Sequence, residues 1–180
     1  MCSIDPALNM PADGAFRVSV AKDYLSFSAA HFVTIAGHKC ESLHGHNYAV
    51  TVTAEGAVDP ETGFVVDFAV LKRILQPVLR ELDHRVLLPT ENPKVRIREE
   101  DGRVRVDYRG EDRFVFPSSN VARIPVTDTT AELLAELLAR AVVAGLPAEG
   151  VATVTRIVVD VEESPGQSGT FEVVITQRTS

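Results

Sequence analysis

The residues best suited to chemistry lie together in the first third of the chain. His31 precedes the motif Cys40-Glu41-Ser42-Leu43-His44-Gly45-His46 by nine residues. Alternate side chains of a β-strand share one face, so His44 and His46 would point in the same direction. With His31 at the end of a preceding strand-like run, three imidazoles could hold Zn²⁺ and keep a fourth position for water or substrate. We therefore predict a catalytic zinc site with ligands His31, His44 and His46.

Cys40 has two interpretations. It could be a fourth zinc ligand in a closed structural site, or a reactive thiolate beside an open one. The pair Asp83-His84, which follows a helical pattern, favours catalysis, because a histidine oriented by an acidic neighbour can exchange protons with a thiol or a substrate oxygen. Taken alone, this pair would be better explained as a helix C-terminus, where a histidine near the last carbonyls is common.

Two further groups of charged residues could bind a ligand. Glu162 ends an apolar strand pattern, and its carboxylate would suit paired N–H donors such as those of a 2-amino-4-oxo pyrimidine ring; surface charge is the alternative, and Glu163 is interpreted as the solvated neighbour. A second group of basic residues could bind phosphate, but it alternates with acidic residues, which favours a solvated, salt-paired face. Its members are Arg96, Arg98, Arg103, Arg105, Arg109 and Arg113.

Composition restricts the class of protein. A chain of 180 residues with 45% hydrophobic and 24% charged residues is typical of one globular domain, here 1–180. The net charge of −7 argues against nucleic acid as a partner. A small anionic substrate fits this charge if basic residues gather locally. No apolar run is long enough to span a membrane, and two cysteines do not make a disulfide framework, so we expect a cytoplasmic location.

The hydrophobic patterns predict an α+β fold with element order β-β-α-α-β-β. Four strands are expected to form an antiparallel sheet with both helices on one face, and a meander of short strands is inserted at about 89–127. Pro77 should kink or split the first helix, and Thr129 with Glu132 resembles a capping box for the second. A lone sheet of this kind leaves one face and its edges open, which favours self-association. The expected strands are 16–31, 48–54, 153–161 and 170–176, and the helices 67–82 and 129–145.

Several motifs in order resemble the 6-pyruvoyltetrahydropterin synthase/6-carboxytetrahydropterin synthase family. They are Phe27-Ser28-Ala29-Ala30-His31, Cys40-x-x-x-His44-Gly45-His46-Asn47-Tyr48, Gly63-Phe64-Val65-Val66-Asp67-Phe68, Leu82-Asp83-His84, Thr130-Ala131-Glu132 and Val161-Glu162. The resemblance implies the tunnelling fold (T-fold), a homo-oligomer that is commonly a hexamer of two stacked trimers, and active sites between subunits. The segment 89–127 departs from the family pattern and could reshape the rim of the active site or an oligomer contact.

The resemblance also assigns roles to residues. It implies that Cys40 is the general base, that Asp83 and His84 form its proton relay, and that Glu162 anchors the pterin. The segment from Thr130 to Glu132 would assist in binding, and His31, His44 and His46 would hold the zinc.

The expected substrate is 7,8-dihydroneopterin triphosphate. The short gap between Cys40 and His44 resembles the bacterial members of the queuosine pathway, which form 6-carboxy-5,6,7,8-tetrahydropterin with loss of acetaldehyde and triphosphate. Glu41 resembles a subgroup that releases 6-hydroxymethyl-dihydropterin for folate synthesis, where it would be an additional acid or base. Three more functions fit parts of the pattern: 6-pyruvoyltetrahydropterin synthase, a metal-free dihydroneopterin aldolase, and a non-catalytic zinc-stabilised binding module.

Overall fold

A six-stranded sheet forms the body of the protein in the computed structural model, which describes residues 15–35 and 39–176; Cys2 and His38 lie outside this range. Four long strands form its antiparallel part: β1 (Phe16–His31), β4 (His44–Gly56), β10 (Val154–Ser164) and β11 (Gln167–Val174). These are the four expected strands. Two short strands not expected from the sequence, β5 (Arg85–Pro89) and β9 (Val121–Ile124), extend the sheet in parallel beside β1.

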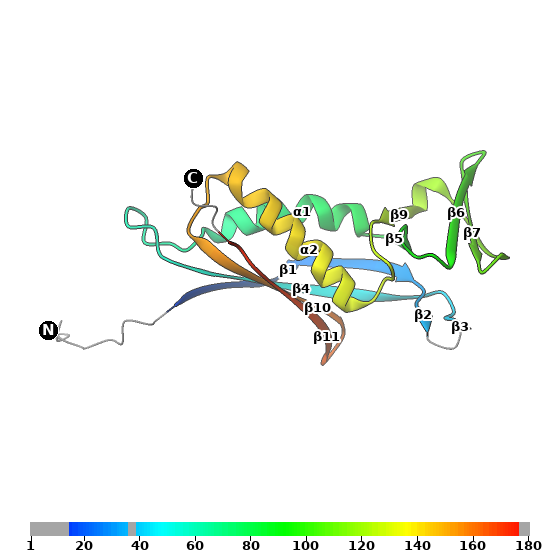
Figure 1. Ribbon diagram of the computed structural model, residues 1–180, viewed down its shortest axis with the longest axis horizontal. Helices are drawn as coiled ribbons and strands as arrows, with labels where there is room; N and C mark the ends of the chain where they lie inside the picture. Colours follow the sequence, from blue (N-terminus) through cyan, green and yellow to red (C-terminus); the bar gives the residue numbers. More distant parts are fainter. Residues whose placement is uncertain (1–14, 36–38, 177–180) are drawn as a thin grey trace, which may run out of the picture.

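Both helices cover one face of this sheet, as predicted (Figure 1). The core lies between the two layers, because the inward-facing residues of β1, β4 and β10 alternate with exposed ones, as in Tyr48, Val50 and Val52 of β4. The pairing of β1 with β4 changes register between Ala21 and Ser26. The opposite face of the sheet has no helix over it within the described residues.

The first helix, α1 (Phe68–Leu82), begins where Asp67 accepts a hydrogen bond from the backbone N–H of Ala69. The helix continues through Pro77 without a break, so the expected split is not present. The second helix, α2 (Ala131–Gly145), ends in a short 3₁₀ turn, Leu146–Glu149. Neither of these helices is long and apolar enough to cross a membrane.

The predicted capping box of α2 was wrong by one residue. Thr130 is the N-cap and accepts from the N–H of Leu133. Thr129 is fully buried, and its hydroxyl donates to the carbonyl of Phe32 at 2.9 Å. The hydroxyl is therefore used to hold the end of β1 against the start of α2.

Between the helices, three strands form a separate antiparallel meander: β6 (Val95–Glu100), β7 (Arg103–Tyr108) and β8 (Glu111–Pro117). A 3₁₀ turn, Ser118–Asn120, leads from the meander to β9. The inner side of the meander buries Val104 and Val106 with Phe32 in a second apolar cluster. Phe32 directly follows His31, so the meander packs beside the segment that begins the histidine motif. Two short antiparallel strands, β2 (Thr34–Ile35) and β3 (Lys39–Cys40), lie in this segment and are called here the β2–β3 hairpin.

Candidate active site

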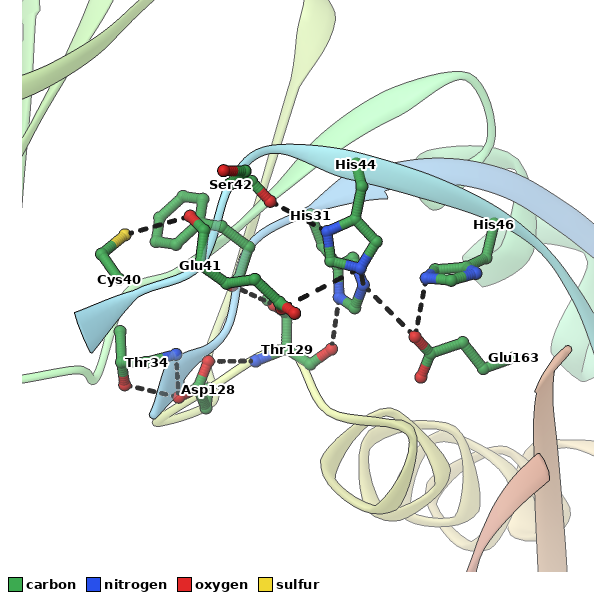
Figure 2. Close-up of polar contacts among 11 residues, drawn as sticks. His31, Thr34, Cys40, Glu41, Ser42, His44, His46, Asp128, Thr129 and Glu163 are labelled. Carbon is green, nitrogen blue, oxygen red and sulfur yellow. Dashed lines mark hydrogen bonds and ion pairs between the residues drawn. The ribbon is translucent and has the colours of Figure 1, made fainter. Parts of the chain in front are cut away.

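The three predicted histidines converge at one end of the sheet. β1 and β4 pair so that His31 lies opposite His44, and His46 follows on the same face of β4. One ligand atom from each histidine and one from Glu163 all lie within 4.8 Å of one another (Figure 2). This group, called here the His/Glu cluster, could hold a metal ion.

Backbone carbonyls orient two of the rings. The Nδ1–H of His31 donates to the carbonyl of Thr129 at 2.9 Å, and that of His44 donates to the carbonyl of Ser42 at 2.9 Å. Each ring is thereby left with Nε2 as its metal-facing atom. The two Nε2 atoms are 3.1 Å apart, close to the separation of about 3.3 Å that tetrahedral zinc with its usual zinc–nitrogen distances would impose.

The remaining members of the cluster also favour a cation. Nε2 of His46 lies 2.8 Å from Oε1 of Glu163, yet the geometry leaves that buried nitrogen without a hydrogen bond. The same carboxylate oxygen is 3.5 Å from Nε2 of His31. Burial lowers the pKa of His31, which keeps this ring neutral, the form that binds metal. A divalent ion would satisfy these nitrogens together.

Glu163 is the member of the His/Glu cluster that the sequence interpretation missed. Ile157, Val159 and Val161 face the core from β10, and alternation places Glu163 on the same face, beside the histidines. Glu162 is on the other face and accepts from the N–H of Gly166 at 3.2 Å. The interpretation of Glu163 as the solvated neighbour was therefore wrong, and the period of two in β10 was the signal that could have found it.

Cys40 and Glu41 lie beside the cluster but face different ways. A carboxylate oxygen of Glu41 is 3.9 Å from Nε2 of His44, and in Figure 2 its side chain extends toward the histidines. The Cys40 sulfur contacts the carbonyl of Glu41 at 3.6 Å and packs against the apolar cluster of the meander. Burial raises the pKa of its thiol, and Arg113 acts in the opposite direction. Within one chain, Glu41 is thus the nearer base.

Asp83 and His84 form a pair on the open face of the sheet. Nδ1 of His84 is 2.9 Å from a carboxylate oxygen of Asp83, whose other oxygen accepts from the N–H of Ser28 at 2.8 Å. This N–H lowers the pKa of Asp83, with a smaller contribution from His84. The imidazole is 81% exposed and lines a hollow of about 430 Å³ with Ser28 and Asn47. No hydrogen bond or ion pair among the described residues connects the pair to Cys40.

The segment from Thr130 to Glu132, predicted to assist in binding, directly follows Thr129, whose carbonyl accepts a hydrogen bond from His31. Thr130 is engaged as the N-cap. Glu132 is exposed in the first helical turn, and its carboxylate contacts no described residue by a hydrogen bond or ion pair. Asp128, which was not singled out from the sequence, accepts from the N–H and hydroxyl of Thr34 and so ties the β2–β3 hairpin to this helix.

The helix-covered sheet and the His/Glu cluster define a mixed α+β protein with a site that could bind a metal ion. Comparisons with known proteins show the family to which it belongs. Residues 20–173 match the family described as 6-pyruvoyl tetrahydropterin synthase. The chain belongs to this family of pterin enzymes, a lyase family, and the resemblance seen in its motifs is confirmed.

Similar proteins extend this result. A Methanocaldococcus jannaschii protein with a provisional name as a 6-carboxy-5,6,7,8-tetrahydropterin synthase is 32% identical over 148 residues, which are 82% of this chain and 89% of that protein. A dihydroneopterin monophosphate aldolase of Pyrococcus furiosus is 45% identical over 62 residues, 34% of this chain and 52% of that protein.

A solved structure of Plasmodium vivax 6-pyruvoyltetrahydropterin synthase, in which a catalytic glutamate has been replaced, superposes with a TM-score of 0.82 at 28% identity. The match covers 91% of this chain and all of that one. The predicted T-fold is thereby confirmed.

Proposed function

We propose that the protein is a zinc-dependent lyase that converts 7,8-dihydroneopterin triphosphate to 6-carboxy-5,6,7,8-tetrahydropterin, with loss of acetaldehyde and triphosphate. The observation that carries the proposal is the convergence of His31, His44 and His46 on one point at an accessible end of the sheet. Membership of the family and the provisional name of the Methanocaldococcus jannaschii relative support the same reaction.

The three imidazoles would hold the metal through nitrogen atoms that suit zinc. Zinc bound there would supply Lewis-acid polarisation of the substrate's side-chain oxygens, which makes the neighbouring carbon-bound hydrogens more acidic. The chain itself supplies the orientation of the rings through the carbonyls of Thr129 and Ser42. It would also supply the groups that accept protons, the carboxylate of Glu41 and, in its ionised form, the thiolate of Cys40.

The residue that binds the pterin ring is better placed at Glu163 than at Glu162. Glu163 is half-buried beside His46, whereas the carboxylate of Glu162 lies on the other face of β10. A carboxylate next to the metal presents two acceptor oxygens to the paired N–H groups of a pterin. We infer that a bound pterin would draw Glu163 away from His46, so that the three histidines would be the residues that hold the metal.

Asp83 and His84 would complete the proton relay from a neighbouring subunit. Among the described residues of one chain, no contact joins the pair to Cys40, and the pair faces the side of the sheet that neither α1 nor α2 covers. A second copy could bring its own Cys40 to this pair, in keeping with the active sites between subunits that the resemblance implies. Exposed Phe16, Phe64 and Phe68 at the other end of the sheet also suit burial against a second copy. The hexamer, the cytoplasmic location and the queuosine pathway stay predictions.

The direct test is to incubate the zinc-loaded protein with 7,8-dihydroneopterin triphosphate and identify the pterin by mass spectrometry. The expected product is the 6-carboxy compound. A 6-pyruvoyl or 6-hydroxymethyl pterin as the main product would replace the proposed reaction by another of the same family. Stoichiometric zinc without turnover of the pterin would favour the non-catalytic binding module.

A second function is favoured by the position of Glu41. Its carboxylate, not the Cys40 thiol, is the group nearest the histidines. Two similar proteins agree with this function: the Plasmodium vivax enzyme has a catalytic glutamate, and the Pyrococcus furiosus protein is an aldolase. Formation of 6-hydroxymethyl-dihydropterin with Glu41 as base is the corresponding activity. Glu41→Gln should abolish that product and keep the carboxy product, whereas Cys40→Ala should do the reverse.

A further inference from the structure

A polar hollow of about 350 Å³ lies between the β2–β3 hairpin and the meander. It is lined by Cys40, Tyr108, Arg109, Glu111 and Arg113. Cys40 is thus a wall of this hollow, while the next residue, Glu41, reaches to 3.9 Å from His44. The hollow and the His/Glu cluster are thus joined through two consecutive residues, Cys40 in the wall of one and Glu41 beside the other.

Only part of the salt-paired face expected from the sequence is formed. Arg98 pairs with Asp107 and Arg105 with Glu100, and Arg123 nearby pairs with Glu99. Arg96, Arg103, Arg109 and Arg113 form no ion pair with any described residue. Of these four, Arg109 and Arg113 line the hollow, and both are exposed. Arg113 instead directs a guanidinium N–H toward the carbonyl of Cys40 at 3.5 Å.

Tyr108 provides an independent indication of a ligand. Its side chain is only 8% exposed, and its hydroxyl is buried without a hydrogen-bond partner in the described part of the chain. A buried hydroxyl of this kind is costly, and native structures usually satisfy it with a protein group, water or a ligand. A donor hydroxyl beside two unpaired guanidinium groups has the chemistry that recognises phosphate oxygens.

We propose that this hollow is the subsite for the phosphate chain of the substrate, with Arg109 and Arg113 as its cations and Tyr108 as a hydroxyl donor. The inference rests on the proposed function, because a pterin triphosphate bound at the histidines would place its phosphates past Cys40. The meander then determines substrate specificity by selecting phosphorylated over unphosphorylated pterins. Glu111 opposes binding, since its carboxylate lowers the positive charge of the hollow.

The test measures binding of the magnesium complex of inorganic tripolyphosphate to the full zinc-loaded chain by titration calorimetry. Zinc content is checked afterwards, because tripolyphosphate also chelates metals. Arg109→Ala combined with Arg113→Ala should weaken binding at least about tenfold, because charge-assisted hydrogen bonds are among the stronger ones. Tyr108→Phe should weaken it by a few-fold.

Two matched variants make the result specific. Arg103→Ala removes the same charge from an exposed position of β7 outside the hollow and should leave the affinity within about twofold of wild type. Glu111→Gln should tighten binding, which loss of structure could not produce. Equal weakening by Arg103→Ala, or no weakening by the double variant, would overturn the subsite.

This measurement does not depend on turnover. If binding follows Arg109 and Arg113 while no pterin product forms, the proposed reaction fails and the phosphate subsite stands. If the 6-carboxy product forms but tripolyphosphate binding ignores both arginines, the subsite fails and the reaction stands.

Discussion

The two faces of the sheet carry different halves of the predicted chemistry. On the helix-covered face, His31, His44, His46 and Glu163 converge within 4.8 Å, and backbone carbonyls fix two of the rings. On the open face, the Asp83–His84 pair is ordered by one backbone N–H, but its imidazole is 81% exposed and reaches no other predicted catalytic residue. One chain thus brings the cluster together by itself, whereas the relay proposed for Asp83 and His84 would need a second chain to reach Cys40.

The largest expected effect is on the helix-covered face. His44→Ala removes one of three imidazoles, so bound zinc should fall from near stoichiometric to below about a tenth, with loss of turnover. Elemental analysis of the purified variant gives the zinc content directly. His84→Ala is the control, because its ring is on the other face and should leave the metal in place. A His44→Ala protein that keeps its zinc would contradict the assignment of the three histidines as the metal ligands.

The open face is tested by mixing subunits. Cys40→Ala and His84→Ala should each lower turnover by roughly 10²–10⁴-fold, the usual contribution of an acid or base. Dissociated and reassembled together, they should regain up to about a quarter of wild-type activity if each site takes Cys40 and His84 from different subunits. If mixing restores nothing while both variants assemble and bind zinc, the relay is not shared between subunits.

Glu163 and Glu162 are adjacent residues of β10 whose side chains lie on opposite faces of the strand, so each serves as a control for the other. Glu163→Gln keeps the size of the side chain but removes its charge, so the KM for the pterin substrate should rise about tenfold or more while zinc is retained. Glu162→Gln should change the KM by less than about twofold. Steady-state kinetics with parallel zinc analysis separates the roles: loss of zinc in Glu163→Gln would identify a ligand instead of a pterin anchor.

The smallest effect concerns the pH dependence of stability. The N–H of Ser28 and the adjacent His84 lower the pKa of Asp83. The folded state therefore gains stability from this carboxylate above its unfolded pKa of about 3.9, and loses it as the pH falls through the lower folded value. Urea midpoints at pH 7 should be slightly lower for Asp83→Asn than for wild type, and the difference should shrink near pH 3. A difference that persists at pH 3 would point to lost packing.

Local sequence patterns predicted most of the long strands and both helices. Period-two alternation located β1, β4 and β10, and the three- and four-residue spacing of apolar residues located α1 and α2, because each pattern reflects which side of a single element faces the core. The short strands β5 and β9 escaped detection. Their hydrogen bonds run to β1 and to each other across distant parts of the chain, so no local period marks them.

The amino-acid sequence alone determined the residue types of the candidate metal site, since His44 and His46 share a face in any strand that contains them. Only the tertiary structure decided which carboxylates join them. Glu163 reaches the histidines because β10 pairs with β4, and Glu41 does so because the β2–β3 hairpin is tied to Asp128. Asp83 and His84 lie on the opposite face because α1 delivers the chain to the far side of β1. Contacts of this kind depend on long-range strand pairing, which neighbouring residues along the chain do not encode.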